Sequence, residues 1–170
     1  KILVTGVAGF LGSHLAEQLA NLGHEVIGID SMIGGYKDNI PNNIKFHNID
    51  CCNFEEVKTI MPKVDVVYHC AATAHEGLSV FSPYEITKNN YLASVSIFSA
   101  AINNKVKRII YCSSMARYGD QAAPFLESME PSPVDPYAIS KVAAEDVLIN
   151  LCELNNTEWV IAVPHNIIGP

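Results

Sequence analysis

The chain has 170 residues, a length typical of one domain with a sizeable core. Its composition, 49% apolar and 17% charged, is that of a compact α/β protein and excludes a disordered chain. A net charge of −7 without any basic run argues against nucleic acid or an anionic membrane as the main partner, and no apolar run is long enough to span a membrane.

The first predicted elements are a strand, a glycine-rich turn and a helix. Residues 2–4 form an apolar run typical of a strand buried in a parallel sheet. Gly6, Gly9 and Gly12 follow with the spacing G-x-x-G-x-x-G. The first suits a tight turn, the second lets the backbone approach a pyrophosphate, and the third lets the helix lie close to the sheet. Leucines at helical spacing predict one buried stripe, Leu11, Leu15, Leu19 and Leu22.

A second strand, 25–29, ends in Asp30, twenty-four residues after Gly6. A carboxylate at this distance is expected to accept hydrogen bonds from the hydroxyls of an adenosine ribose and to repel a 2′-phosphate, which favours NAD over NADP. Spaced glycines alone also serve ordinary tight turns. The strand, helix and acid around them indicate a dinucleotide-binding unit instead.

The next segment brings a loop and a third strand. Residues 31–39 form a glycine-bearing loop beside the expected adenosine, and residues 44–49 alternate as a strand that ends at Asp50 and Cys51. Asp50 suits the adenine amino group, although a solvated loop aspartate fits the pattern equally well.

A short helix, 54–61, and a fourth strand, 64–70, come next. The strand runs into Ala71 and Ala72. Small residues at the carboxyl end of a strand permit close approach of a flat cofactor or its ribose.

The segment after the fourth strand contains a long helix. Residues 73–82 show no clear period, and Pro83 then begins a helix that extends to about Asn104. Asn90 is the one polar member of its apolar stripe, and a buried asparagine needs a hydrogen-bond partner. The stripe consists of Ile86, Asn90, Ala93, Ile97 and Ala101.

The last predicted elements are a strand at 107–112, a helix at 137–154 with Val142, Ala143, Val147, Ile149 and Leu151 among its apolar positions, and a strand at 158–163. Ser113 and Ser114 follow the fifth strand. Strands that alternate with helices predict an α/β fold with a doubly wound parallel sheet, whose ligands bind beyond the carboxyl ends of the strands.

Tyr137 and Lys141 are spaced i, i+4 and therefore share one helix face. A nearby ammonium is expected to lower the pKa of the phenol and make it a usable base. Ser114 can donate a hydrogen bond to the same substrate oxygen. The proton of a carbinol then goes to Tyr137 and its hydride to a nicotinamide. The spacing by itself also fits an ordinary surface pair.

Other polar side chains have simpler interpretations. His69, Cys70 and His75 do not have the spacing of a common metal site, so a structural or pocket-lining role is expected and no metal is predicted. Arg117 either reaches an anionic substrate or forms a surface salt bridge, which is the favoured reading. His14 and His24 are expected to be exposed.

The sequence resembles the extended short-chain dehydrogenase/reductase family, and within it the nucleotide-sugar epimerases and dehydratases, of which the UDP-glucose 4-epimerases are most similar. The resemblance covers essentially the whole chain. The matching stretches are TGVAGFLGSHL at 5–15, Asp30, Asp50-Cys51, HCAA at 69–72, Asn90, CSSMARYGD at 112–120, DPYAISK at 135–141 and PHNIIGP at 164–170.

The resemblance implies a catalytic trio of Ser114, Tyr137 and Lys141. It further implies that Lys141 also binds the nicotinamide ribose, and that Asn90 holds either the catalytic geometry or the lysine through water. Asn166 is implied to contact the diphosphate of the nucleotide-sugar, to which Ser114 and Tyr137 also bind. The residues expected at the NAD site are Gly6, Gly9, Phe10, Leu11, Gly12, Asp30, Ser31, Gly35, Asp50, Cys51, Ala71, Ala72, Asn90, Tyr137, Lys141 and Pro164.

Two departures from the family pattern bear on the reaction. Val163 replaces an arginine often found before the proline. Met115 and Ala116 follow Ser114 where 4,6-dehydratases of this group carry an Asp-Glu pair. Without that pair, dehydration lacks its proton donor and acceptor, which favours UDP-sugar 4-epimerisation. A nucleotide-sugar reductase or dehydrogenase and a non-catalytic NAD-binding protein remain the alternatives.

The remaining expectations concern the whole protein. Five cysteines, two of them adjacent, fit no disulfide framework, so a reducing compartment, the cytoplasm, is expected. Residues 1–170 are interpreted as the NAD-binding domain of a longer protein, whose smaller C-terminal substrate domain is missing. We also expect a homodimer, and a fragment that cannot by itself turn over a nucleotide-sugar.

Overall fold

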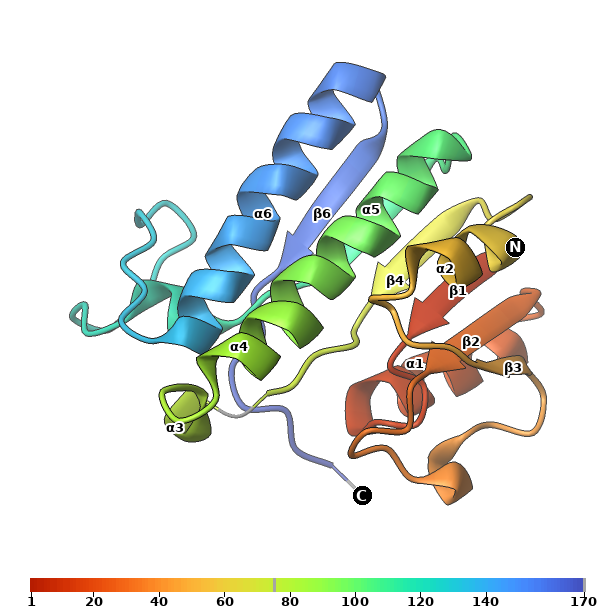
Figure 1. Ribbon diagram of the computed structural model, residues 1–170, viewed down its shortest axis with the longest axis horizontal. Helices are drawn as coiled ribbons and strands as arrows, with labels where there is room; N and C mark the ends of the chain where they lie inside the picture. The colour runs from red at the N-terminus through yellow and green to blue at the C-terminus, as the bar shows by residue number, and fades with distance from the viewer. Residues whose placement is uncertain (75, 170) are drawn as a thin grey trace.

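The computed structural model describes residues 1–74 and 76–169, which contain a six-stranded parallel sheet with helices on both faces (Figure 1). The strand order is β3-β2-β1-β4-β5-β6. The first three strands are added from β1 toward one edge of the sheet and the last three from β4 toward the other, so the order of the strands reverses between β1 and β4. This confirms the predicted doubly wound sheet. The strands are β1 (Ile2–Thr5), β2 (Val26–Asp30), β3 (Lys45–Asn48), β4 (Val66–His69), β5 (Arg108–Cys112) and β6 (Glu158–Ala162).

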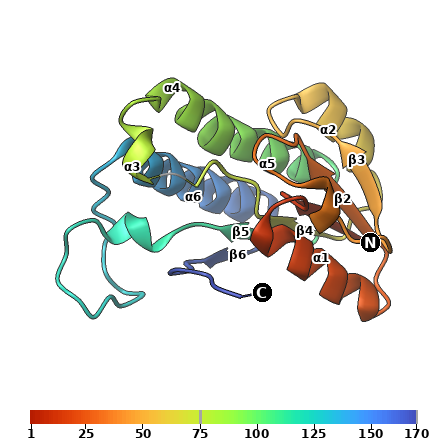
Figure 2. The same cartoon turned by 90° about the horizontal axis from the view of Figure 1, so that it is seen from below.

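The helices divide unequally between the two faces. Figure 2 shows α1 on one side of the sheet, and α2, α5 and α6 on the other. Among the described residues, no helix is long and apolar enough to cross a membrane. The longer helices are α1 (Phe10–Asn21), α2 (Phe54–Ile60), α5 (Ala93–Asn103) and α6 (Pro136–Asn155).

The buried face of α1 differs from the predicted leucine stripe. Its buried residues are Gly12, Ser13, Ala16 and Leu19, whereas Leu22 is 74% exposed. The helix approaches the first turn so closely that a Cβ on Gly12 would lie 2.1 Å from the Gly6 carbonyl oxygen. Small residues therefore face the sheet.

The predicted long helix is present but is not regular throughout. It consists of α4 (Pro83–Ile86), a π-helical segment η2 (Thr87–Leu92) and α5. The predicted stripe is buried, with Asn90 only 1% exposed. Sequence reasoning missed the short helix α3 (Glu76–Ser79), because four residues show no period.

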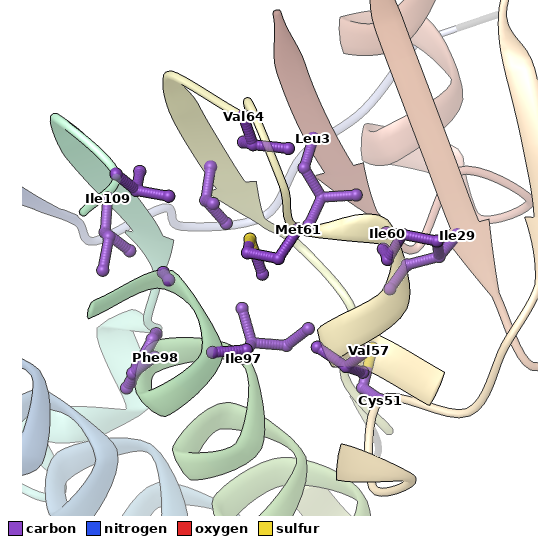
Figure 3. Packing of buried hydrophobic residues seen from close by; sticks show 14 of the residues in the cluster. Leu3, Ile29, Cys51, Val57, Ile60, Met61, Val64, Ile97, Phe98 and Ile109 are labelled. Atoms are coloured by element: carbon purple, nitrogen blue, oxygen red, sulfur yellow. The ribbon is translucent and has the colours of Figure 1, made fainter. Parts of the chain in front are cut away.

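The main core lies between the sheet and α2, α5 and α6 (Figure 3). Leu3, Ile109, Phe98 and Leu148 are fully buried there. In α6 the predicted apolar positions Val142, Ala143, Val147, Ile149 and Leu151 are only half-buried. The helix instead buries a mixed stripe, which consists of Tyr137, Ala138, Ser140, Lys141, Ala144, Glu145, Leu148 and Cys152.

Candidate active site

A cavity of about 770 Å³ lies at the carboxyl edge of the sheet. It is bordered by the turns after β1, β2, β4 and β5 and by the segment after β6, as expected for a doubly wound sheet. Asn90 is the only predicted site residue that does not line it, among the residues that the structure describes. The predicted residues in its wall are Gly6, Gly9, Phe10, Leu11, Gly12, Asp30, Ser31, Gly35, Asp50, Cys51, Ala71, Ala72, Ser114, Tyr137, Lys141, Pro164 and Asn166.

The glycine turn has the close contacts that its spacing predicts. Gly6 adopts a φ of +76°, and a Cβ there would lie 2.9 Å from the backbone of Ala71. The Gly9 N–H donates to the Gly6 carbonyl oxygen at 3.1 Å, and Gly9 begins α1 without a side-chain cap. The N–H groups of the first helical turn therefore border the cavity as donors for an anionic group.

Asp30 is fixed in position by backbone donors from two different turns. Its Oδ2 accepts from the Ala8 N–H at 3.0 Å, and its Oδ1 accepts from the Met32 N–H at 2.8 Å. Each carboxylate oxygen keeps lone-pair capacity for a further donor. The side chain thus presents a fixed pair of acceptors at the end of β2, as ribose hydroxyls require.

The neighbouring wall combines small residues with a second acid. A Cβ on Gly35 would lie 2.7 Å from the Ala8 side chain, so the loop after β2 packs directly on the glycine turn. Asp50 accepts a hydrogen bond from the Cys52 N–H at 2.8 Å through Oδ1. This contact fixes the Asp50 carboxylate at the cavity edge and leaves Oδ2 available.

Asn90 lies behind the cavity wall. Its Oδ1 accepts from the Thr73 N–H at 2.7 Å, and its Nδ2 donates to the Thr73 carbonyl oxygen at 3.2 Å. The amide thus holds the loop after β4, and Thr73 itself lines the cavity. The partner that a buried asparagine needs is present, and the side chain supports the wall without contacting the cavity.

His69 connects the same loop to the glycine turn through a buried hydrogen-bond chain. Thr5 Oγ1 accepts from the N–H groups of Cys70 and Ala71 at 3.1 and 3.0 Å, so its own proton is free for His69 Nδ1, 2.7 Å away. His69 Nε2 then donates to Ser94 Oγ at 2.9 Å. Burial lowers the pKa of His69 to about 3, which keeps the ring neutral. These buried hydrogen bonds agree with the structural role expected for His69.

Lys141 projects from α6 beneath the strand ends. Its ammonium is buried and donates to the Cys112 carbonyl oxygen at 2.8 Å. It lies 5.0 Å from the centre of the Tyr111 ring and 5.9 Å from that of Tyr137. Burial lowers the pKa of Lys141 to about 8, so the group is still mainly protonated at neutral pH.

The pKa of Tyr137 runs against the prediction. We expected Lys141 to lower it, but burial raises it, and Glu76 and Asp135 add to the increase, while the Ser114 hydroxyl opposes it. The prediction was wrong because burial has the largest effect on the pKa of this phenol. Ser114 Oγ accepts from the Ala116 N–H at 3.2 Å, which leaves its proton for another acceptor.

Glu145 completes a buried network that sequence reasoning missed. Its carboxylate accepts from Ser113 Oγ and lies 3.2 Å from the guanidinium of Arg117. The predicted salt bridge of Arg117 is present, but its expected place on the surface is wrong, since the Arg117 side chain is 16% exposed and that of Glu145 is 3% exposed. A usable signal existed, because Glu145 follows Lys141 at i+4 on the buried face of α6.

Several residues of the cavity wall carried no signal in the sequence. Ile33 and Thr73 lie in loops, Glu76 begins α3 and Asn89 lies in η2, and none of the four belongs to a pattern that marks a site. The described part of the chain holds no group of three or more potential metal ligands. His75, which was considered as a metal ligand, and Pro170, the last residue of the PHNIIGP stretch, lie outside the described residues. His14 and His24 are exposed, as expected.

Comparison with known proteins places these features in a family. The family model for the NAD dependent epimerase/dehydratase family matches residues 2–170. A UDP-glucuronate 4-epimerase from Thermodesulfobacterium geofontis is 31% identical over 156 residues, which cover 84% of this chain and 48% of the relative. A human dTDP-D-glucose 4,6-dehydratase is 33% identical over 183 residues. This match covers 100% of this chain and 52% of the length of the relative.

Solved structures show the same likeness. The UDP-glucose 4-epimerase of Thermotoga maritima with UDP-glucose has a TM-score of 0.96 and 30% identity, over 99% of this chain and 56% of that one. The Thermus thermophilus UDP-glucose 4-epimerase complex with NAD has a TM-score of 0.89 and 32% identity, over 94% of this chain and 53% of that one. The chain spans about half the length of the curated relatives it matches.

Proposed function

The chain belongs to the NAD-dependent epimerase/dehydratase family, and we propose that the full-length protein is a UDP-sugar 4-epimerase. The observation that carries this proposal is the meeting of Ser114, Tyr137 and Lys141 at one end of a cavity whose other end has the glycine turn and Asp30. A dinucleotide that spans the cavity would place its pyrophosphate at the glycine turn and its nicotinamide beside the reacting carbon at the other end.

The residues present fit NAD. The first turn of α1 offers N–H groups for a pyrophosphate, and the backbone-held Asp30 offers two acceptors for the ribose. Asp50 and Gly35 border the adenosine end, and Lys141 borders the other. The described residues of the cavity wall include no arginine, and Lys141 is the only lysine, so a 2′-phosphate next to Asp30 lacks a cation.

The chemistry at the sugar follows from the chain's own side chains. Tyr137 takes the proton of the hydroxyl at carbon 4, and Ser114 donates a hydrogen bond to the same oxygen. Lys141, fixed by the Cys112 carbonyl, supplies a positive charge beside the phenol. NAD, when bound, supplies the hydride acceptor and, in its oxidised form, a further positive charge that favours the phenolate. The 4-keto sugar would then rotate in the site, so that its other face receives the returning hydride.

Some relatives are dehydratases, but the residues after Ser114 lack the acid and base that dehydration needs. Met115 and Ala116 occupy the first positions of the 3-10 segment η3 (Met115–Tyr118). Neither side chain can donate or accept the proton that loss of water from the sugar requires. A nucleotide-sugar reductase or dehydrogenase uses the same trio and is the second candidate.

We further propose that the described residues form an NAD-binding domain, and that the rest of the full-length protein supplies the opposite wall of the sugar site. The support is that the chain spans about half of its relatives. Asn166, at the cavity edge after β6, is proposed to contact the nucleotide-sugar. A homodimer in the cytoplasm remains our proposal for its state and location.

One assay on the full-length protein separates these candidates. UDP-glucose, UDP-galactose, their N-acetyl and uronate forms, and dTDP-glucose are incubated with it, and the sugars and the reduced-nicotinamide absorbance are followed. An epimerase interconverts a pair without net change in absorbance. A dehydrogenase or reductase changes the absorbance stoichiometrically, and a dehydratase accumulates a 4-keto-6-deoxy sugar. No conversion in any series would contradict an enzymatic function.

Tyr137→Phe tests the assigned base. The variant keeps the ring that packs in α6 but loses the proton acceptor, so we expect turnover to fall at least ~100-fold while NAD binding is retained. Tyr84→Phe is the matched control, because Tyr84 is 75% exposed on α4, and it should keep full activity. Turnover that survives in Tyr137→Phe would show that another group is the base.

A further inference from the structure

The mechanism makes no use of two thiols that meet in the cavity wall. Cys70 directly follows β4 and Cys112 ends β5, and their sulfur atoms lie 3.5 Å apart. Both residues line the cavity and both are only partly buried. Since the cavity is open to small molecules, the pair is accessible from the site where the cofactor is proposed to bind.

The backbone geometry of this pair suits a covalent link. The last register pair of the two parallel strands is His69 with Tyr111, so Cys70 and Cys112 follow it side by side. Neighbouring strands lie about 4.8 Å apart. That spacing falls within the range of about 4.4–6.8 Å between the Cα atoms of disulfides. The two sulfur atoms can therefore form a disulfide bond by a closer approach alone, while the pairing of the two strands stays as it is.

We propose that Cys70 and Cys112 form a peroxide-reactive dithiol in the cofactor cavity, which closes to an intramolecular disulfide. The Cys112 thiolate attacks one oxygen of hydrogen peroxide, the O–O bond breaks, and hydroxide leaves while Cys112 becomes a sulfenic acid. That hydroxide takes up the proton that Cys112 released and becomes the first water. Cys70 then attacks the Cys112 sulfur, and the Cys70 proton goes to the hydroxyl that leaves this sulfur as the second water. The S–O bond breaks and the S–S bond forms. Two thiols and one peroxide thus yield one disulfide and two waters.

The electrostatic surroundings favour Cys112 as the attacking thiol. A hydrogen bond from Cys70 and the nearby Lys141 ammonium lower the pKa of Cys112, although burial opposes them. The pKa of Cys70 is raised, because it donates that hydrogen bond and is buried. Burial raises the pKa of the other three thiols, so within the described residues Cys112 alone has a lowered value, and Cys51, Cys52 and Cys152 do not.

The test is peroxide treatment of the full-length protein, with and without NAD, followed by blocking of free thiols and mapping of the peptides by mass. The expected result is one linked pair of peptides, those that contain Cys70 and Cys112, with the loss of two hydrogen atoms and recovery by dithiothreitol. NAD at ten times its Kd should slow the linkage about tenfold, since only the free fraction reacts. NAD binding is measured by calorimetry on the same samples, so a failure to bind NAD is seen separately.

Two variants distinguish a specific pair from general oxidation. Cys70→Ser should lose the disulfide completely and leave a sulfenic acid at Cys112 that dimedone traps. Cys52→Ser is the matched control, since Cys52 is also partly buried but its thiol donates to the Lys88 carbonyl at 3.2 Å, and it should form the disulfide at an unchanged rate. The proposal is overturned if the wild-type protein links other cysteines, or if Cys112 stays reduced while Cys52 is oxidised.

Discussion

At the scale of single residues, Asp30 shows how the backbone makes a side chain selective. Two N–H groups, from Ala8 and Met32, hold its oxygens and fix the rotamer of a carboxylate that is only 9% exposed. A ribose with two free hydroxyls can donate to such a fixed pair, whereas a phosphate on the 2′-oxygen meets a like charge. We therefore expect the proposed preference for NAD over NADP to depend on this one side chain.

Asp30→Ala tests that property. We expect affinity for NAD to fall about 10- to 100-fold, the value of one or two hydrogen bonds to a charged group, and discrimination against NADP to disappear. Calorimetric titration of both dinucleotides measures the effect. Asp38→Ala, which removes an exposed carboxylate from the loop that follows Asp30, should change neither affinity. An unchanged preference in Asp30→Ala would contradict the assignment.

His69 makes stability depend on pH. The unfolded chain binds a proton at this histidine near pH 6.5, but the folded protein does so only at about 3, because the ring is buried. Between these values the unfolded state holds more protons, so the free energy of unfolding falls as the pH is lowered from 6.5. The slope for one group is at most about 1.4 kcal/mol per pH unit.

Urea unfolding between pH 6.5 and 4.5 measures this slope. His69→Asn should lack most of it, whatever the stability of the variant itself, while His24→Asn, at an exposed position, should keep it. Equal slopes in all three proteins would show that His69 is not the group that titrates.

At the scale of elements, Glu145 fixes the loop after β5 to α6. It lies on α6 one turn beyond Lys141 and binds Ser113 at the end of β5 and Arg117 in η3. The residues on either side of Ser114 are thereby held at a set distance from Tyr137. A buried ion pair with a hydrogen-bonded hydroxyl is suited to define position more than to add stability.

Glu145→Ala should destabilise the protein by about 3 kcal/mol, because it leaves the Arg117 guanidinium buried without its partner. Chemical denaturation of the variant and of Asp146→Ala gives the comparison. Asp146 is the exposed neighbour on the same helix, so its loss should change stability by less than ~0.5 kcal/mol. A similar loss of stability in both variants would contradict the conclusion that Glu145 holds the loop after β5 to α6.

Elements with a strong period were predictable from the sequence, and contacts between distant segments were not. All six strands and the glycine turn follow from apolar runs and spacing. The π-helical turn and α3 do not, because one extra residue in a helix or four residues in a loop leave no period. The buried stripe of α6 was misassigned because polar Lys141 and Glu145 occupy it. The link between Thr5 and His69 joins residues 64 positions apart, which no local pattern reveals.

At the scale of the whole molecule, our proposal is that the described residues supply one side of a two-sided site. The glycine turn and Asp30 border one end of the cavity, and Ser114, Tyr137 and Lys141 border the other. Relatives of about twice this length belong to the same family. Orientation of a sugar at the catalytic trio needs contacts from both sides, so we expect turnover to require the full-length protein.

The measurement that tests the central claim most directly uses a nucleotide-sugar labelled with deuterium at carbon 4. The full-length protein is incubated with labelled UDP-glucose or its N-acetyl or uronate form, and the products are analysed by mass and NMR. A 4-epimerase that removes and returns the same hydride gives the C4 epimer with the deuterium still at carbon 4 and no net reduced nicotinamide. Loss of the label to solvent, its appearance in released cofactor, or the absence of a C4 epimer from every labelled sugar would contradict the account.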